Sequence, residues 1–194
     1  MKRIRVGAPL TLLVAAGCVL GTYLPGAAHF GISGGLGSLL LPWTWLRLFT
    51  WPFVHADTTH LLGNMMFFLL LSPNLEKKQG WFEYLFALLA TALVIGVGHL
   101  AFGHANTALI GASGWVFMMI ILSTFVGGEV GTISVPTLIV GGLYAWQEIR
   151  AALTPNQVSQ FAHLLGGVCG LIFGLLGSGQ PAAQDSPGGP LAVK

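Results

Sequence analysis

The stretch SQFAHLLGGVCGLIFG, residues 159–174, predicts how this chain packs. Within an almost entirely apolar run it carries one histidine, His163, followed by Gly166, Gly170 and Gly174. A helix brings residues at i+3, i+7 and i+11 close to one face, so the glycines form a stripe beneath the histidine. Glycine stripes let two helix backbones approach closely. We therefore expect a helix that packs tightly against a second helix, with a polar group above the contact.

The composition indicates a membrane protein. Of the 194 residues, 54% are hydrophobic and only 7% are charged, whereas a soluble domain carries about 25% charged residues. So few charges cannot cover a surface that faces water, and the natural solvent is a lipid bilayer. The net charge of +2 argues against a nucleic-acid partner. Cys18 and Cys169 both lie in apolar runs, so we expect buried thiols and no disulfide.

Apolar runs of membrane length predict six helical spans, at residues 8–24, 59–72, 81–102, 109–127, 132–151 and 158–177. The connection 25–58 is rich in Trp and Pro, which suits a re-entrant or surface-lying structure at the membrane interface. The end of the chain, 178–194, is rich in Gly, Pro, Ser and Ala and is expected to be a disordered cytoplasmic tail. The sequence thus predicts one helical membrane domain, residues 1–177, and a tail.

Charge predicts the orientation. With a cytoplasmic N-terminus, the inner side collects most of the basic residues, in agreement with the positive-inside rule. The inner set is Lys2, Arg3, Arg5, Lys77, Lys78 and Lys194, and the outer set is Arg47 and Arg150. Six spans then leave both termini inside. The basic and apolar N-terminus also has the pattern of a signal peptide, whose removal would leave the remaining topology unchanged.

Polar residues within the spans indicate function, because such groups are costly at membrane depth. In HADTTHLLGN, residues 55–64, His60 and Asn64 are four apart and share a helix face. The alternative is a polar seam that bonds neighbouring helices. His55 precedes His60 by five residues, roughly 140° around a helix, which suits one metal ion poorly, so we expect no metal site.

In IGASG, residues 110–114, the hydroxyl of Ser113 lies at the outer, N-terminal end of the fourth span. Unpaired N–H groups at a helix start can hold an oxyanion, although small-residue packing is the alternative. His163 is expected at nearly the same depth, and histidine is the usual base for a serine nucleophile. The residues favour a Ser–His dyad, with His60, Asn64 and the Ser113 N–H as oxyanion donors. Asp57 is the only nearby outer acid, and the sequence gives no geometric reason to recruit it.

These motifs, in this order and over residues 8–177, resemble those of the rhomboid family of intramembrane serine proteases. HADTTHLLGN resembles the family's histidine and asparagine signature, GASG its GxSG, and AHLLGGVCG its AHxxGxxxG. Glu76, in LEKKQG, lies where the family has a loop with a helix-tying Glu, and Arg47 lies where its Trp-Arg pair places the Arg. Two positions depart from the family: Leu46 replaces the usual tryptophan, and Phe117 replaces a tyrosine that often stacks on the histidine.

The resemblance implies an all-α six-transmembrane-helix bundle with a long first extracytoplasmic loop. It implies a serine endopeptidase that cleaves transmembrane segments of single-pass proteins near the outer leaflet, without a cofactor, in a cell membrane of prokaryotic type. Ser113 would be the nucleophile, His163 the base, and His60 and Asn64 the oxyanion hole. The residues implied to support this site are His55, Arg47, Glu76, Gly111, Gly114, Phe117, Gly166 and Gly170.

Two alternatives stand beside the protease. One is a non-catalytic relative that binds membrane helices, against which the presence of both Ser113 and His163 argues. The other is a small transporter or proton channel, which would usually show an inner as well as an outer polar path. The inner halves of the fourth and sixth spans offer only Ser123 and Thr124.

Overall fold

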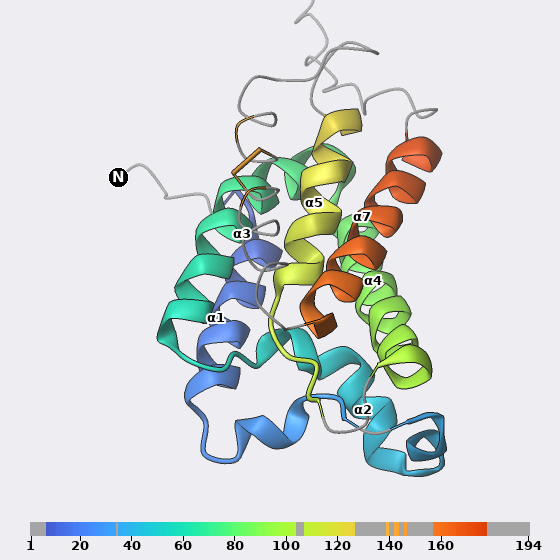
Figure 1. Ribbon diagram of the computed structural model, residues 1–194. Helices are drawn as coiled ribbons and strands as arrows, with labels where there is room; N and C mark the ends of the chain where they lie inside the picture. The colour runs from blue at the N-terminus through green and yellow to red at the C-terminus, as the bar shows by residue number, and fades with distance from the viewer. Residues whose placement is uncertain are drawn as a thin grey trace, which may run out of the picture.

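A computed structural model describes residues 7–33, 35–103, 107–126 and 157–177, together with the isolated positions 139, 142, 143 and 146. The all-α prediction is confirmed for this part of the chain (Figure 1). Its α-helices are α1 (Pro9–Tyr23), α2 (Pro42–Thr50), α3 (Thr58–Gln79), α4 (Trp81–Phe102), α5 (Ser113–Val126) and α7 (Gln157–Gly177). Three short 3-10 helices are η1 (Ala27–Phe30), η2 (Leu36–Leu40) and η3 (Trp51–Phe53).

Two of the described helices are long and apolar enough to cross a membrane, α4 and the Gln160–Gly177 part of α7. α1 and α5 are apolar but have only 15 and 14 residues. At about 1.5 Å per residue they reach roughly 21–23 Å, which is less than the ~30 Å hydrocarbon core of a bilayer. Most of the expected fifth span, 132–151, and the whole tail, 178–194, lie outside the described residues. Six spans therefore stay a prediction.

α3 is longer than the sequence indicated. The sequence places the second span at 59–72, with an extension through the PNL that follows it left open, and the helix does continue through Pro73 to Gln79. A proline costs a helix one backbone hydrogen bond, but membrane helices tolerate it where neighbouring elements compensate. The helix ends at Gly80, whose φ of +90° lies in the left-handed region. Glu76 consequently lies inside α3, and the expected loop around it is absent.

α5 is shorter than the apolar run 109–127. The first four residues of that run, 109–112, are not helical, since Leu109 pairs with Ile32 through two backbone hydrogen bonds of 2.8 and 3.1 Å. Gly111 then takes a φ of +102°, which a right-handed helix does not allow. The helix therefore begins at Ser113 itself.

α3, α5 and α7 run in the same direction. At one end His60 of α3 approaches Gly111, just before α5, and at the other end Lys78 Nζ of α3 donates to the carbonyl of Val126, 3.0 Å away. α5 lies between α3 and α7 (Figure 1) and shares its largest interface with α7. This common direction agrees with the topology expected for the second, fourth and sixth spans.

The interface between α5 and α7 is a contact between backbones. A Cβ atom at Gly166 would collide with the carbonyl oxygen of Gly114, and one at Gly170 would collide with that of Met118. One turn further, a Cβ at Gly174 would collide with the ring of Phe125. This is the close approach that the glycine stripe predicts.

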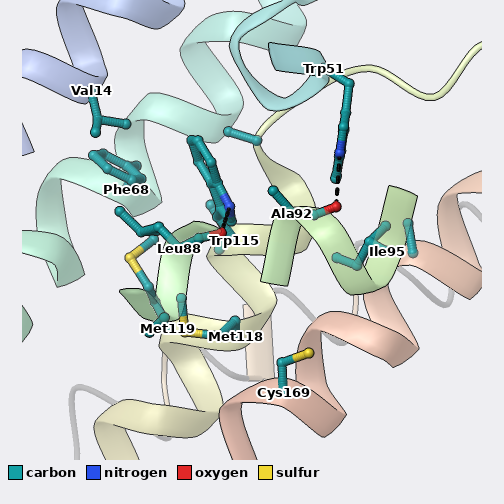
Figure 2. Packing of buried hydrophobic residues seen from close by; sticks show 14 of the residues in the cluster. Val14, Trp51, Phe68, Leu88, Ala92, Ile95, Trp115, Met118, Met119 and Cys169 are labelled. Carbon is teal, nitrogen blue, oxygen red and sulfur yellow. Dashed lines mark hydrogen bonds between the residues drawn. The ribbon is translucent and has the colours of Figure 1, made fainter. Parts of the chain in front are cut away.

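Two tryptophans fix α4 against the centre of the molecule (Figure 2). Trp51 Nε1 donates to the carbonyl of Ala92 at 3.1 Å, and Trp115 Nε1 donates to that of Leu88 at 2.8 Å. Both indoles are buried, and a buried indole needs a partner for its N–H. The two acceptors are one turn apart on α4, so η3 and α5 are attached to the same stretch of that helix.

Glu76 ties α3 to the start of α1. Its buried carboxylate accepts hydrogen bonds from the N–H groups of Leu10 and Thr11, at 2.9 and 2.7 Å, and from the Thr11 hydroxyl at 2.7 Å. These N–H groups belong to the first turn of α1, where a negative charge is favoured by the helix dipole. Ser72 and Tyr84 extend this polar cluster to α4.

Candidate active site

Ser113 and His163 are brought together although 50 residues separate them in the sequence. Ser113 Oγ lies 2.8 Å from His163 Nε2, within hydrogen-bond distance. Ser113 is half-buried as the first residue of α5, and His163 is buried in α7, just above Gly166. The backbone contact between the two helices therefore sets the distance between hydroxyl and imidazole.

The ring of Phe117 stacks on the imidazole of His163. The ring centroids are 4.7 Å apart, and the planes differ by 15°. Phe117 follows Ser113 by about one turn of α5, so the same helix carries the hydroxyl and the aromatic ring against which the histidine packs. Stacking needs no phenolic hydroxyl, and the phenylalanine provides this flat surface.

The segment that leads to Ser113 is held at successive residues. His99 Nε2 lies 3.3 Å from the carbonyl of Thr107, and the Leu109 backbone pairs with Ile32. The Gly111 N–H donates to the carbonyl of Trp51 at 3.3 Å. The Ala112 N–H donates to His55 Nε2, also at 3.3 Å. The backbone on the N-terminal side of the serine is thus fixed by four other parts of the fold.

His55 acts as an acceptor in this arrangement. The hydroxyl of Thr22 donates to the carbonyl of Cys18 at 2.7 Å and also lies 3.3 Å from His55 Nδ1. Since Nε2 accepts from Ala112, the neutral ring carries its proton on Nδ1. Burial, and after it the nearby His60, lowers the pKa of His55 to about 4, and a backbone hydrogen bond with Phe53 opposes the shift. His55 is therefore neutral at physiological pH.

His60 and Asn64 face the backbone just before the serine. A Cβ atom at Gly111 would lie 2.7 Å from His60 Nε2 and 3.4 Å from Asn64 Nδ2, so only glycine fits between them. Asn64 is buried, and its Nδ2 has no hydrogen-bond partner among the residues that the structure describes. Two side-chain nitrogens thus converge on Gly111, two residues before Ser113, and the one from Asn64 has no acceptor among the described residues.

The remaining predicted residues lie away from Ser113 or serve packing. Glu76 is at the far end of α3, bound to α1. Arg47 is half-buried in the last turn of α2, where its carbonyl accepts from the backbone N–H of Trp51. The adjacent Leu46 is exposed. At Gly114 a Cβ would lie 2.5 Å from the side chain of Ile95. Gly114, Gly166 and Gly170 are therefore contact residues between helices.

Two groups near the site have roles not expected from the sequence: Asp57, which was named but given no role, and the N–H of Ala56. Asp57 is the N-cap of α3, and its Oδ1 accepts from the His60 N–H at 2.8 Å. The Ala56 N–H donates to His60 Nδ1 at 3.4 Å. An aspartate before a helix start is a recognisable capping signal, so the role of Asp57 as N-cap could have been predicted from the sequence. The bond from Ala56 depends on the turn geometry and leaves no sequence signal.

A serine hydroxyl hydrogen-bonded to an imidazole, with nitrogen donors on one side, is the set of groups that acyl transfer requires. Comparison with models of protein families matches residues 42–180 to the rhomboid domain. Among curated proteins, the chain is 31% identical over 144 residues to Rhomboid-type serine protease 2 of Neurospora crassa, covering 68% of this chain and 51% of that protein.

It is 31% identical over 145 residues to Rhomboid-related protein 4 of Rattus norvegicus, covering 66% of this chain and 45% of that protein. It is 27% identical over 134 residues to Putative rhomboid protease YdcA of Bacillus subtilis, covering 65% of this chain and 63% of that protein. The chain thus spans about half to two thirds of the length of these relatives. Because the family match extends from α2 through α7 and includes Ser113 and His163, this chain belongs to the membrane-embedded rhomboid family.

Proposed function

We propose that this chain is an intramembrane serine endopeptidase that cleaves transmembrane segments of single-pass membrane proteins near the outer leaflet. The observation that carries the proposal is the 2.8 Å distance between Ser113 Oγ and His163 Nε2. Relatives whose printed names include serine protease support it. The chain would be a multi-pass protein of a prokaryotic plasma membrane, with residues 1–177 as its six-span domain and both termini in the cytoplasm.

His163 is the general base in this proposal. As Ser113 Oγ attacks the scissile carbonyl, His163 Nε2 takes the hydroxyl proton and then gives it to the leaving amine. Water hydrolyses the resulting acyl-enzyme in a second step, with the histidine again as base. The stacked ring of Phe117 limits rotation of the imidazole, so Nε2 keeps facing the hydroxyl.

His60 Nε2, Asn64 Nδ2 and the N–H of Ser113 are the proposed oxyanion donors. The neighbouring N–H of Ala112 is not one of them, because it is bonded to His55. A buried amide without a partner costs about 1–3 kcal/mol, and such a cost is recovered when the oxyanion forms. Asn64 would in this way bind the transition state better than the resting state.

The substrate and water must both reach Ser113. A peptide cannot be hydrolysed in dry lipid, so we propose a hydrated space that opens to the outer side. A transmembrane helix hides its carbonyls in its own hydrogen bonds, so the substrate must unwind locally. Substrate segments with glycine, proline or other helix-weakening residues near the cut would therefore be cleaved best.

We expect Ser113→Ala and His163→Ala each to lower cleavage of a reconstituted single-span substrate by about 10³-fold or more, because neither group works alone. The double variant should cleave the substrate no more slowly than either single variant. Ser123→Ala is the matched control, since this serine lies on the same helix and donates to the Ile120 carbonyl. Cleavage that survives Ser113→Ala would overturn the proposal and favour a non-catalytic relative that binds membrane helices.

Asn64→Leu should move activity and stability in opposite directions. Removing an oxyanion donor typically lowers kcat by about 10²–10³-fold. Replacing a buried amide that lacks a partner by an apolar side chain of similar shape is nearly neutral or stabilising. Cleavage kinetics and thermal unfolding in detergent measure the two effects. A lower Tm with unchanged kcat would show that Asn64 serves the fold alone.

The buried acceptor His55 predicts a loss of stability in acid. In the unfolded chain a histidine titrates near 6.5, whereas burial holds the pKa of His55 at about 4 in the folded chain. Between these values the unfolded chain binds a proton that the folded chain does not, so stability falls as the pH falls from 6.5 to about 4. Above pH 6.5 the titration of His55 makes no contribution to the pH dependence of stability.

Unfolding in detergent as a function of pH tests this expectation. His55→Gln should flatten the decline between pH 6.5 and about 4, because glutamine keeps an acceptor for the Ala112 N–H and cannot titrate there. His29→Gln is the control, since His29 is exposed in η1. An equally steep decline in both variants would exclude His55 as its source.

A further inference from the structure

The two ring nitrogens of His60 have different surroundings. On one side the N–H of Ala56 donates to Nδ1 at 3.4 Å. A backbone amide can only donate, so Nδ1 must be the nitrogen without a proton. A neutral imidazole carries its single proton on one of its two nitrogens. The proton of His60 is therefore on Nε2, and this ring is the opposite tautomer to that of His55.

Nε2 is also the nitrogen that faces the site. It would lie 2.7 Å from a Cβ at Gly111, two residues before Ser113. The ring of His55 packs edge-on against the His60 ring, with centroids 5.1 Å apart and an interplanar angle of 72°. The ring is thus bounded by His55, by the Ala56 amide and by Gly111.

Asp57 fixes the backbone of the same residue. It is the N-cap of α3, and its Oδ1 accepts from the N–H of His60 at 2.8 Å. In a capping box, the cap residue binds the N–H of the third helical residue, whose side chain binds a backbone N–H in return. Here the third residue is His60, and its return bond reaches Ala56, one residue before the cap. Both bonds of this variant capping box end on His60.

We propose that Asp57 is a positioning residue that, together with the Ala56 N–H, orients His60 and keeps its proton on Nε2 as a hydrogen-bond donor toward the oxyanion. This inference rests on the proposed protease function for its catalytic consequence, whereas the tautomer itself does not depend on activity. Without the cap, the first turn of α3 loses the bond that sets the direction of the His60 side chain, and the Ala56 bond loses its geometry.

Kinetics of cleavage test the positioning role. Asp57→Ala should lower kcat by roughly fivefold or more with little change in KM, as expected for the loss of a cap that acts in the transition state. Asp57→Asn should stay within about twofold of the parent, because an asparagine side chain also accepts from the His60 N–H. Thr59→Ala is the matched control, an exposed residue of the same turn.

A double-variant cycle separates positioning from general support of the fold. If Asp57 acts through His60, Asp57→Ala should cause no further loss of kcat in a His60→Ala background. An equal loss of kcat in both backgrounds would overturn the inference, as would an Asp57→Ala protein with the kcat of the parent. Ser113→Ala, assayed in parallel, decides whether the protease function itself holds.

A spectroscopic measurement covers the case in which Asp57→Ala does not fold. In the ¹⁵N-histidine NMR spectrum of the full chain, the signal that disappears in His60→Ala should show a protonated Nε2 and an unprotonated Nδ1. A proton on Nδ1 would overturn the inference, whether or not the chain cleaves a substrate.

Discussion

In the contact between α5 and α7, the backbone of Gly166 lies against the carbonyl of Gly114, and that of Gly170 lies against the carbonyl of Met118. The 2.8 Å distance between Ser113 and His163 exists because these two backbones meet without side chains between them. A displacement of about 1 Å at a reacting pair can cost about 10²-fold in rate. The glycines below Ser113 would therefore bear on the proposed reaction through this distance alone.

A second constraint is the cost of unpaired polar groups in an apolar surrounding. The backbone N–H groups just before the serine avoid this cost by donating to Trp51 and His55. The indole N–H of Trp115 avoids it by donating to a carbonyl of α4. The amide of Asn64 is the exception at this end of α3. Among the described residues, the Asn64 amide nitrogen is thus a buried donor near Gly111 that lacks an acceptor, and the proposed function would supply that acceptor as an oxyanion.

The sequence predicted the parts of the fold that depend on periodicity. The spacing of His163 from its glycines, the shared face of His60 and Asn64, and the bounds of α4 all follow from local pattern. The start of α5 at Ser113 does not, because it depends on the pairing of Leu109 with Ile32, far away in the chain. The continuation of α3 past Pro73 is likewise not fixed by local pattern, because a proline on its own signals a helix end. The residues of the candidate site could be named from the sequence, whereas the hydrogen-bond partners of His55 and His60 needed the folded backbone.

The most direct test of the central claim, that His163 activates Ser113 across the α5–α7 contact, is covalent labelling by a serine-reactive fluorophosphonate, followed by mass spectrometry of the modified peptide. The chain should be labelled at Ser113, and labelling should be lost in a folded His163→Ala variant. Labelling at another serine, or an unchanged rate of labelling at Ser113 without His163, would contradict it.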